Sequence, residues 1–93
     1  MTVLIDPPRW PAHGRLWAHL VSDVSYAELH EFAAAHGIPA RGFDHDHFDV
    51  PGESYQLLIA AGAVPVTSRE LVARLSASGL RRPKRERRLA ASS

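Results

Sequence analysis

The chain has no cysteine, which excludes a disulfide framework and any metal site built on thiolates. A bound metal would therefore need His and carboxylate ligands. The chain also lacks an apolar run of the roughly 18 residues that span a membrane, and its start does not read as a signal peptide. We expect a cytoplasmic protein without membrane contact.

Length is also limited. A chain of 93 residues is enough for one domain and not for two. A domain of this size buries only roughly 60% of its unfolded surface, so its stability margin is narrow. Assembly into a homo-oligomer would bury more surface, and the sequence leaves the monomer and the homo-oligomer both open.

Basic charge is scarce until the end of the chain. Residues 1–80 hold five Arg against nine Asp and Glu, a net charge of −4, whereas residues 81–93 hold six Lys and Arg against one Glu, a net charge of +5. This contrast indicates a single domain over residues 1–79 and a basic, disordered tail over residues 80–93. Residues 81–88 would attract nucleic-acid phosphates without reading sequence; the alternative is a tail that only keeps the protein in solution.

Three predicted helices have clear start and stop signals in the sequence. Ser25 with Glu28 and Thr67 with Glu70 form capping-box patterns at the start of the first and third helices. The second begins near Pro51, a residue suited to a first helical turn. Glycines at positions 37, 62 and 79 follow the apolar stripes and end the three helices.

Short apolar runs at residues 2–5, 16–21 and 63–66 are typical of strands, and residues 46–50 can form another short strand. Pro65 places the last of them at a sheet edge, because proline cannot donate to a ladder. Residues 6–15, with three prolines, read as a loop. Strands that alternate with helices predict an α/β domain with a small, mainly parallel sheet of about four short strands covered by three helices.

Candidate site residues are concentrated at positions 43–49, where five of seven residues are His or Asp. These side chains bind divalent metals or move protons near neutral pH. At strand period, His45 and His47 would lie on one face and Asp44 and Asp46 on the other, so one pair could simply be solvated.

Ligands of open α/β sheets bind at the carboxyl ends of the strands. If all strands were parallel, Asp6, Asp23 and Asp49 would gather at that edge, flanked by His19 and His47. Such a set suits Zn²⁺, Mn²⁺ or Mg²⁺. If the second strand were antiparallel to the first, Asp6 and Asp23 would lie at opposite ends and the cluster would weaken.

Each of these residues also has a structural interpretation. Asp23 and Asp49 could stabilise helix amino termini, and His19 could be a hydrogen-bonded core residue. Arg15 beside Gly14 suits a phosphate or carboxylate, or it could pair with Asp6 or Asp23. The tryptophans at positions 10 and 17 could stack a ligand ring or pack the loop.

Several motifs together resemble a small bacterial and phage family catalogued only as domain of unknown function 4031. They are Val3-Leu4-Ile5-Asp6, Gly14-Arg15, His19, Ser22-Asp23, Glu28-Leu29-His30, His47-Phe48-Asp49 and Ala61-Gly62-Ala63. The resemblance covers residues 1–79 and implies that the functional positions are Asp6, Arg15, His19, Asp23, His47 and Asp49. It implies no reaction.

Three functions remain open. The first is a metal-dependent hydrolase of phosphoesters, in which His47, Asp49, His19 and Asp6 bind the metal. Asp6 or His19 would carry protons and Arg15 would hold substrate charge, with Asp23 nearby. The second is a non-catalytic binding or regulatory module. The third is a nucleic-acid accessory protein that acts through residues 81–88.

Overall fold

The fold was analysed in a computed structural model that describes residues 2–82. Of the predicted basic tail, only residues 80–82 are described, so most of the predicted phosphate-binding segment 81–88 lies outside the described residues. No helix within residues 2–82 is both long enough and apolar enough to cross a membrane.

A six-stranded mixed sheet forms the centre of the domain, in the order β4-β5-β3-β1-β6, with β2 also paired to β3. The strands are β1 (Val3–Ile5), β2 (Trp10–Ala12), β3 (Arg15–Ser22), β4 (Phe43–Asp44), β5 (His47–Pro51) and β6 (Val64–Pro65). The predicted α/β class is confirmed, but the mainly parallel sheet of about four strands is wrong. Among the strands of residues 2–82, only β1 and β6 pair in parallel; the other four pairings are antiparallel.

Two tight hairpin turns account for the extra strands. His13 and Gly14 both have positive φ, at 51° and 75°, which matches the turn type that joins twisted antiparallel strands. Residues 6–15 therefore contain β2 and are not simply a loop. The second turn, at His45 (φ 62°) and Asp46, joins β4 to β5. Neither turn has the Asn-Gly or Asp-Gly signature that sequence reasoning relies on.

The three predicted helices are present as α1 (Tyr26–Ala35), α2 (Tyr55–Ala60) and α3 (Ser68–Ala77). The predicted start of the second helix near Pro51 is wrong, because Pro51 ends β5 and α2 begins at Tyr55. The Ser25 and Thr67 hydroxyls accept from the amides of Glu28 and Glu70, as the capping patterns predict. Single turns of 3-10 helix also occur at Ala40–Gly42 and Gly52–Ser54. The predicted edge position of the strand with Pro65 is confirmed, because β6 ends the sheet.

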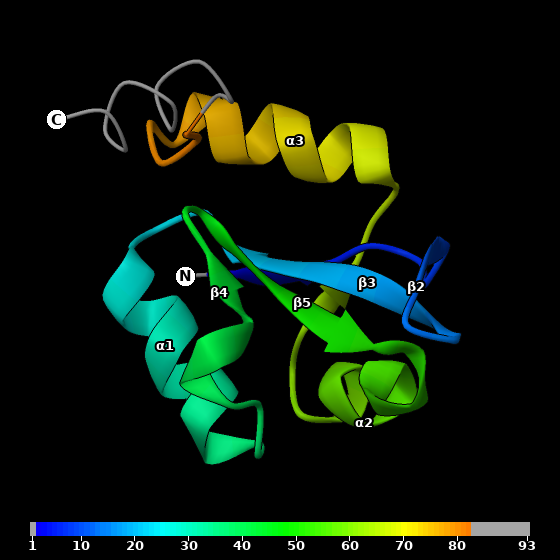
Figure 1. The fold of residues 1–93 in the computed structure, drawn as a ribbon. Helices are drawn as coiled ribbons and strands as arrows, with labels where there is room; N and C mark the ends of the chain where they lie inside the picture. The colour runs from blue at the N-terminus through cyan, green and yellow to red at the C-terminus, as the bar shows by residue number, and fades with distance from the viewer. Residues whose placement is uncertain (1, 83–93) are drawn as a thin grey trace, which may run out of the picture.

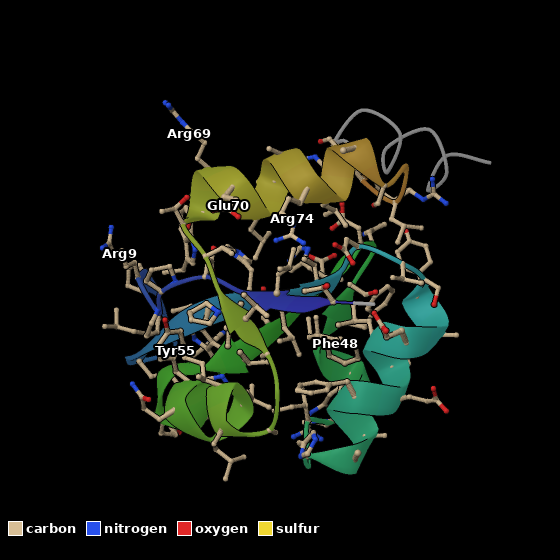
Figure 2. All side chains as sticks on the ribbon, turned by 180° about the vertical axis from the view of Figure 1, so that it is seen from behind. Arg9, Phe48, Tyr55, Arg69, Glu70 and Arg74 are labelled. Carbon is tan, nitrogen blue, oxygen red and sulfur yellow. The ribbon has the colours of Figure 1, made fainter. Side chains whose placement is uncertain are left out.

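The helices lie on both faces of the sheet, with α1 and α2 on one side and α3 on the other (Figure 1). Side chains that alternate along β1 and β3 divide between two cores. Ile5 and Leu20 join the larger core, which includes Phe48 and lies toward α1 and α2. Leu4 and Val21 pack against α3 through Leu71 and Leu75. Figure 2 shows Phe48 on the side of the sheet that faces α1.

Candidate metal centre

Two adjacent strands bring three polar side chains together on the face of the sheet toward α3. His19 in β3 lies directly opposite Asp49 in β5 in the antiparallel register, and His47 precedes Asp49 by two residues. Directly opposed residues and residues two apart share a face of a sheet. One ligand atom from each of His19, His47 and Asp49 lies within 4.8 Å of the others.

Both imidazoles present Nε2 to the same carboxylate. Asp49 Oδ1 is 3.2 Å from His47 Nε2 and 4.0 Å from His19 Nε2. The two rings meet edge to face with their centroids 5.1 Å apart. The side chains are 26% exposed for His19, 15% for His47 and 44% for Asp49, so the cluster is partly open to solvent.

The buried carboxylate of Asp6 orients the ring of His19 through Nδ1, the nitrogen that does not face Asp49. Asp6 follows β1, where its Oδ2 lies 2.9 Å from His19 Nδ1 and its Oδ1 accepts the His19 backbone amide at 2.6 Å. The Ser68 hydroxyl, at the start of α3, donates to Oδ2 of Asp6 at 2.7 Å. Asp6 thus fixes the ring of His19 and leaves Nε2 toward Asp49.

His47 is oriented in the same way by Asp46, which is 2% exposed. Asp46 Oδ1 lies 2.7 Å from His47 Nδ1, and its Oδ2 accepts the backbone amide of Arg82 at 2.7 Å. The cluster therefore contains two carboxylate–imidazole pairs, each with Nδ1 engaged and Nε2 directed to Asp49.

The environment of Asp6 favours its charged form. Burial alone would raise the pKa of this carboxyl, but hydrogen bonds from the side chain and backbone of His19 and from Ser68 lower it, as does the charge of His19. The net effect is a pKa below the ordinary 3.8.

His47 is held in its protonated form. Burial opposes a charged imidazole, but hydrogen bonds to Asp46 and Asp49, together with the charges of both carboxylates, raise the pKa of His47 to about 9. At neutral pH its imidazolium therefore lies between two carboxylates.

Two predicted site residues lie apart from this cluster. Because β3 runs antiparallel to β1, Ser22 pairs with Val3 and Asp23 lies at the opposite end of β1 from Asp6. Asp23 forms an ion pair at 3.0 Å with Arg74 of α3, and Figure 2 shows the Arg74 side chain reaching from the helix toward the sheet. The antiparallel alternative therefore applies, and Asp6, Asp23 and Asp49 do not gather at one sheet edge.

Arg15 is the other predicted residue outside the cluster. It pairs with Glu53 at 2.9 Å on the surface rather than with Asp6 or Asp23. It lines a groove of about 680 Å³ that has Asp49 in its wall and extends from the β2–β3 hairpin to the segment before β5. The groove is lined by Trp10, Ala12, His13, Arg15, Trp17, Ile38, Pro39, Arg41, Gly42, Phe43, Asp44, Asp49 and Pro51.

Sequence reasoning missed the role of Asp46 and assigned Ser68 no partner in the site. Strand alternation placed Asp46 with Asp44, but the turn at His45 interrupts the strand period and buries Asp46. The one available signal was its position directly before His47. Ser68 lies 62 residues from Asp6 in the chain, so no local pattern connects them.

The sequence model of a family described as "Protein of unknown function (DUF4031)" matches residues 3–78. The matched segment contains His19, His47 and Asp49 and both carboxylates behind the imidazoles. Neither the curated proteins nor the solved structures contain a match to the chain.

Proposed function

The chain belongs to the DUF4031 family, whose function is unknown, and we propose that it binds one divalent metal ion through His19, His47 and Asp49. One observation carries this proposal. Two imidazoles, each held at Nδ1 by a buried carboxylate, present Nε2 to the same exposed carboxylate. Carboxylate–imidazole–metal chains are the usual support of histidine ligands, because they fix the tautomer and raise the basicity of the ring.

The ligand set of two imidazoles and one carboxylate suits a metal ion of intermediate softness, such as Zn²⁺. Two imidazoles and one carboxylate are typical of catalytic Zn²⁺ sites, which keep a position for water or substrate. The same set binds Mn²⁺, and it also holds iron(II) in oxygenases. Mg²⁺ fits less well, because it prefers oxygen ligands and keeps several waters.

For the reaction we propose hydrolysis of a phosphoester. A metal in this position would lower the pKa of a bound water toward roughly 7. The metal would supply this water as the nucleophile, and hydrolysis of the ester P–O bond would release an alcohol and a phosphate. Arg15, in the groove beside Asp49, would hold substrate charge, whereas Asp6 would act through His19 without touching the substrate.

Calorimetric titration of the metal-free protein with Zn²⁺, Mn²⁺, iron(II) and Mg²⁺ tests the metal site. We expect one ion per chain, with binding abolished by His19→Ala combined with Asp49→Ala. The matched control is His45→Ala combined with Asp44→Ala, because these residues form a similar pair at 2.6 Å that is about half exposed and outside the cluster. Equal affinities of the site variant and the control variant would refute the proposal.

A second candidate is a non-catalytic module in which the cluster only stabilises the fold. The raised pKa of His47 supports it, because an imidazolium between Asp46 and Asp49 is a complete ion-pair network without any metal. In that case the site variant would lower the melting temperature, and added metal would not raise it in the native protein.

A further inference from the structure

We propose that the groove beside Asp49 binds a ligand that joins a nucleobase to a phosphate, supplied either as a free nucleotide or as a single strand. The inference names the substrate class of the proposed phosphoesterase and rests on that function. A phosphate could lie beside Asp49 because the bound metal would offset the negative charge of this carboxylate. The lining of the groove includes the exposed Trp10, the guanidinium groups of Arg15 and Arg41, and Asp49, the proposed metal ligand.

Trp10 provides the surface for the base. It is 48% exposed, and the other large hydrophobic residues exposed among residues 2–82 are all aliphatic. The β2–β3 register sets Trp10 opposite Trp17, and its ring centroid lies 5.1 Å from that of His19. An exposed indole stacks a base of any identity, at about 1–3 kcal/mol per base.

The side chain of the neighbouring Trp17 already makes contacts within the protein. Its Nε1 donates to the Ala12 carbonyl at 2.9 Å, and the Arg15 guanidinium lies 5.8 Å from the centroid of its ring. Trp17 therefore forms a fixed wall of the groove and holds Arg15 in place. The exposed ring of Trp10 remains the surface on which a base can stack.

Arg15 and Arg41 provide the phosphate contacts. Arg15 comes from β3 and the exposed Arg41 from the segment Ala40–Gly42, and both line the groove. The pairing of Arg15 with Glu53 joins side chains that are 49% and 65% exposed. Surface pairs of this kind contribute little, so a phosphate can replace Glu53. Asp44 and Asp49 are the acidic residues of the lining, and Asp49 is the metal ligand.

The size of the groove agrees with such a ligand. Its volume of about 680 Å³ lies within the range of roughly 300–1,000 Å³ that is usual for small-molecule sites. A mononucleotide can therefore place its base against Trp10 and its phosphate toward the two arginines.

Calorimetry on the full chain loaded with Mn²⁺ tests the proposal with four probes: adenosine 5′-monophosphate, an eight-residue oligothymidylate, adenosine and ribose 5-phosphate. We expect the monophosphate or the oligonucleotide to bind at least tenfold more tightly than either half ligand. Binding of both would indicate a nucleotide unit as the ligand, and binding of the oligonucleotide alone would indicate a single strand. A ribose 5-phosphate affinity equal to that of the monophosphate would overturn the proposal.

Variants separate the groove from the basic end of the chain. Trp10→Ala and Arg41→Ala should each weaken binding about tenfold. Arg69→Ala is the matched control, because Arg69 is an exposed arginine whose side chain points away from the sheet in Figure 2. Attraction by the basic residues 81–93 would survive Trp10→Ala unchanged, and that result would refute the groove as the binding site.

Mn²⁺ titration also distinguishes a failure of the nucleotide-binding proposal from a failure of the metal-site proposal. Arg41 is not one of the three residues that would bind the metal, so Arg41→Ala should keep the native Mn²⁺ affinity in the absence of nucleotide. Normal Mn²⁺ binding without any nucleotide affinity would overturn only the groove proposal. Nucleotide binding that persists in EDTA and is lost in Trp10→Ala would support the groove without the metal.

Discussion

At the residue scale, two Asp-His neighbours in the same hairpin have opposite surroundings. Asp44 and His45 form a pair whose side chains are 48% and 47% exposed, whereas Asp46 is 2% and His47 15% exposed. An exposed pair is screened by water and contributes little. A buried carboxylate instead determines which imidazole nitrogen faces the open side of the site.

This contrast predicts different effects of two similar substitutions. Asp46→Asn should lower Mn²⁺ affinity about 10–100-fold, because it removes the charge behind His47 while it keeps the side-chain shape. Asp44→Asn should leave the affinity unchanged. Calorimetry on both variants, with circular dichroism to verify folding, is the measurement. A similar affinity in both variants would mean that Asp46 does not position a ligand.

Metal binding should depend on pH through His47. Its pKa of about 9 means that Nε2 carries a proton at neutral pH, and a metal must displace that proton. Apparent Mn²⁺ affinity should therefore rise about tenfold per pH unit from pH 6 to pH 8. Titrations in buffers of different ionisation enthalpy would show about one proton released per ion. An affinity that does not change with pH would contradict the model of a displaced proton.

The metal-free protein should lose stability in alkali. The pKa of His47 is raised from 6.5 to about 9 in the folded state, so its contribution is complete below pH 6.5 and is lost as pH rises through 9. The loss amounts to roughly 3 kcal/mol at most. Urea unfolding at pH 6 and pH 10 would measure it, and His47→Gln should abolish this part of the pH dependence. Asp6, whose pKa is lowered, stabilises above pH 3.8 and loses its contribution as pH falls.

At the element scale, the α3 segment contacts both carboxylates that orient the imidazoles. Ser68, its first residue, donates to Asp6, and the amide of Arg82, beyond its end, donates to Asp46. Leu71 and Leu75 anchor the helix between these points. The position of α3 and the orientation of the two imidazoles are therefore linked.

Ser68→Ala tests this link. The variant removes the hydroxyl that donates to Asp6, so we expect Mn²⁺ affinity to fall by about tenfold. The melting temperature should fall as well, because the buried carboxylate of Asp6 loses a hydrogen bond. Ser76→Ala, an exposed position on the same helix, is the control. A larger loss in Ser76→Ala than in Ser68→Ala would exclude a positioning role for Ser68.

At the scale of the whole molecule, the sheet is covered unequally. One face packs against α1 and α2 and the other against α3 (Figure 1). The face toward α3 also carries the polar cluster, and Asp49 of this cluster lines the groove. Residues beyond α3 complete this side. Leu80 packs against the smaller core and accepts a hydrogen bond from Tyr26.

Two truncations should therefore differ. A chain that ends at residue 82 keeps the Arg82 amide that donates to Asp46, whereas a chain that ends at residue 80 loses it. We expect the shorter chain to bind Mn²⁺ more weakly and to melt several degrees lower. Residues 1–82 carry a net charge of −2, from seven Arg against nine Asp and Glu. Both truncated chains should therefore lose the salt-sensitive nucleic-acid binding proposed for the tail. Equal metal affinities would show that residues 81 and 82 do not contribute.

The sequence alone determined local features: helix boundaries and which residues share a face of a strand. The boundaries of α1 and α3 follow from Ser25 and Thr67, because a capping hydroxyl bonds to an amide only three residues away. Period-two alternation likewise placed His47 with Asp49, and Trp17 with His19, on shared faces of their strands. Residue type, spacing and the family resemblance had proposed His19, His47 and Asp49 as metal ligands together with Asp6, and the fold brings the first three within reach of one ion.

Only the tertiary structure decided how these pieces meet. The antiparallel register of β3 with β1 and β5 separated Asp23 from Asp6 and set His19 opposite Asp49. Strand pairing depends on contacts between distant segments and on turns that have no strong signature here. The supporting contacts of Ser68 and Arg82 arise across 62 and 36 residues. No local pattern encodes them, because they depend on where α3 packs.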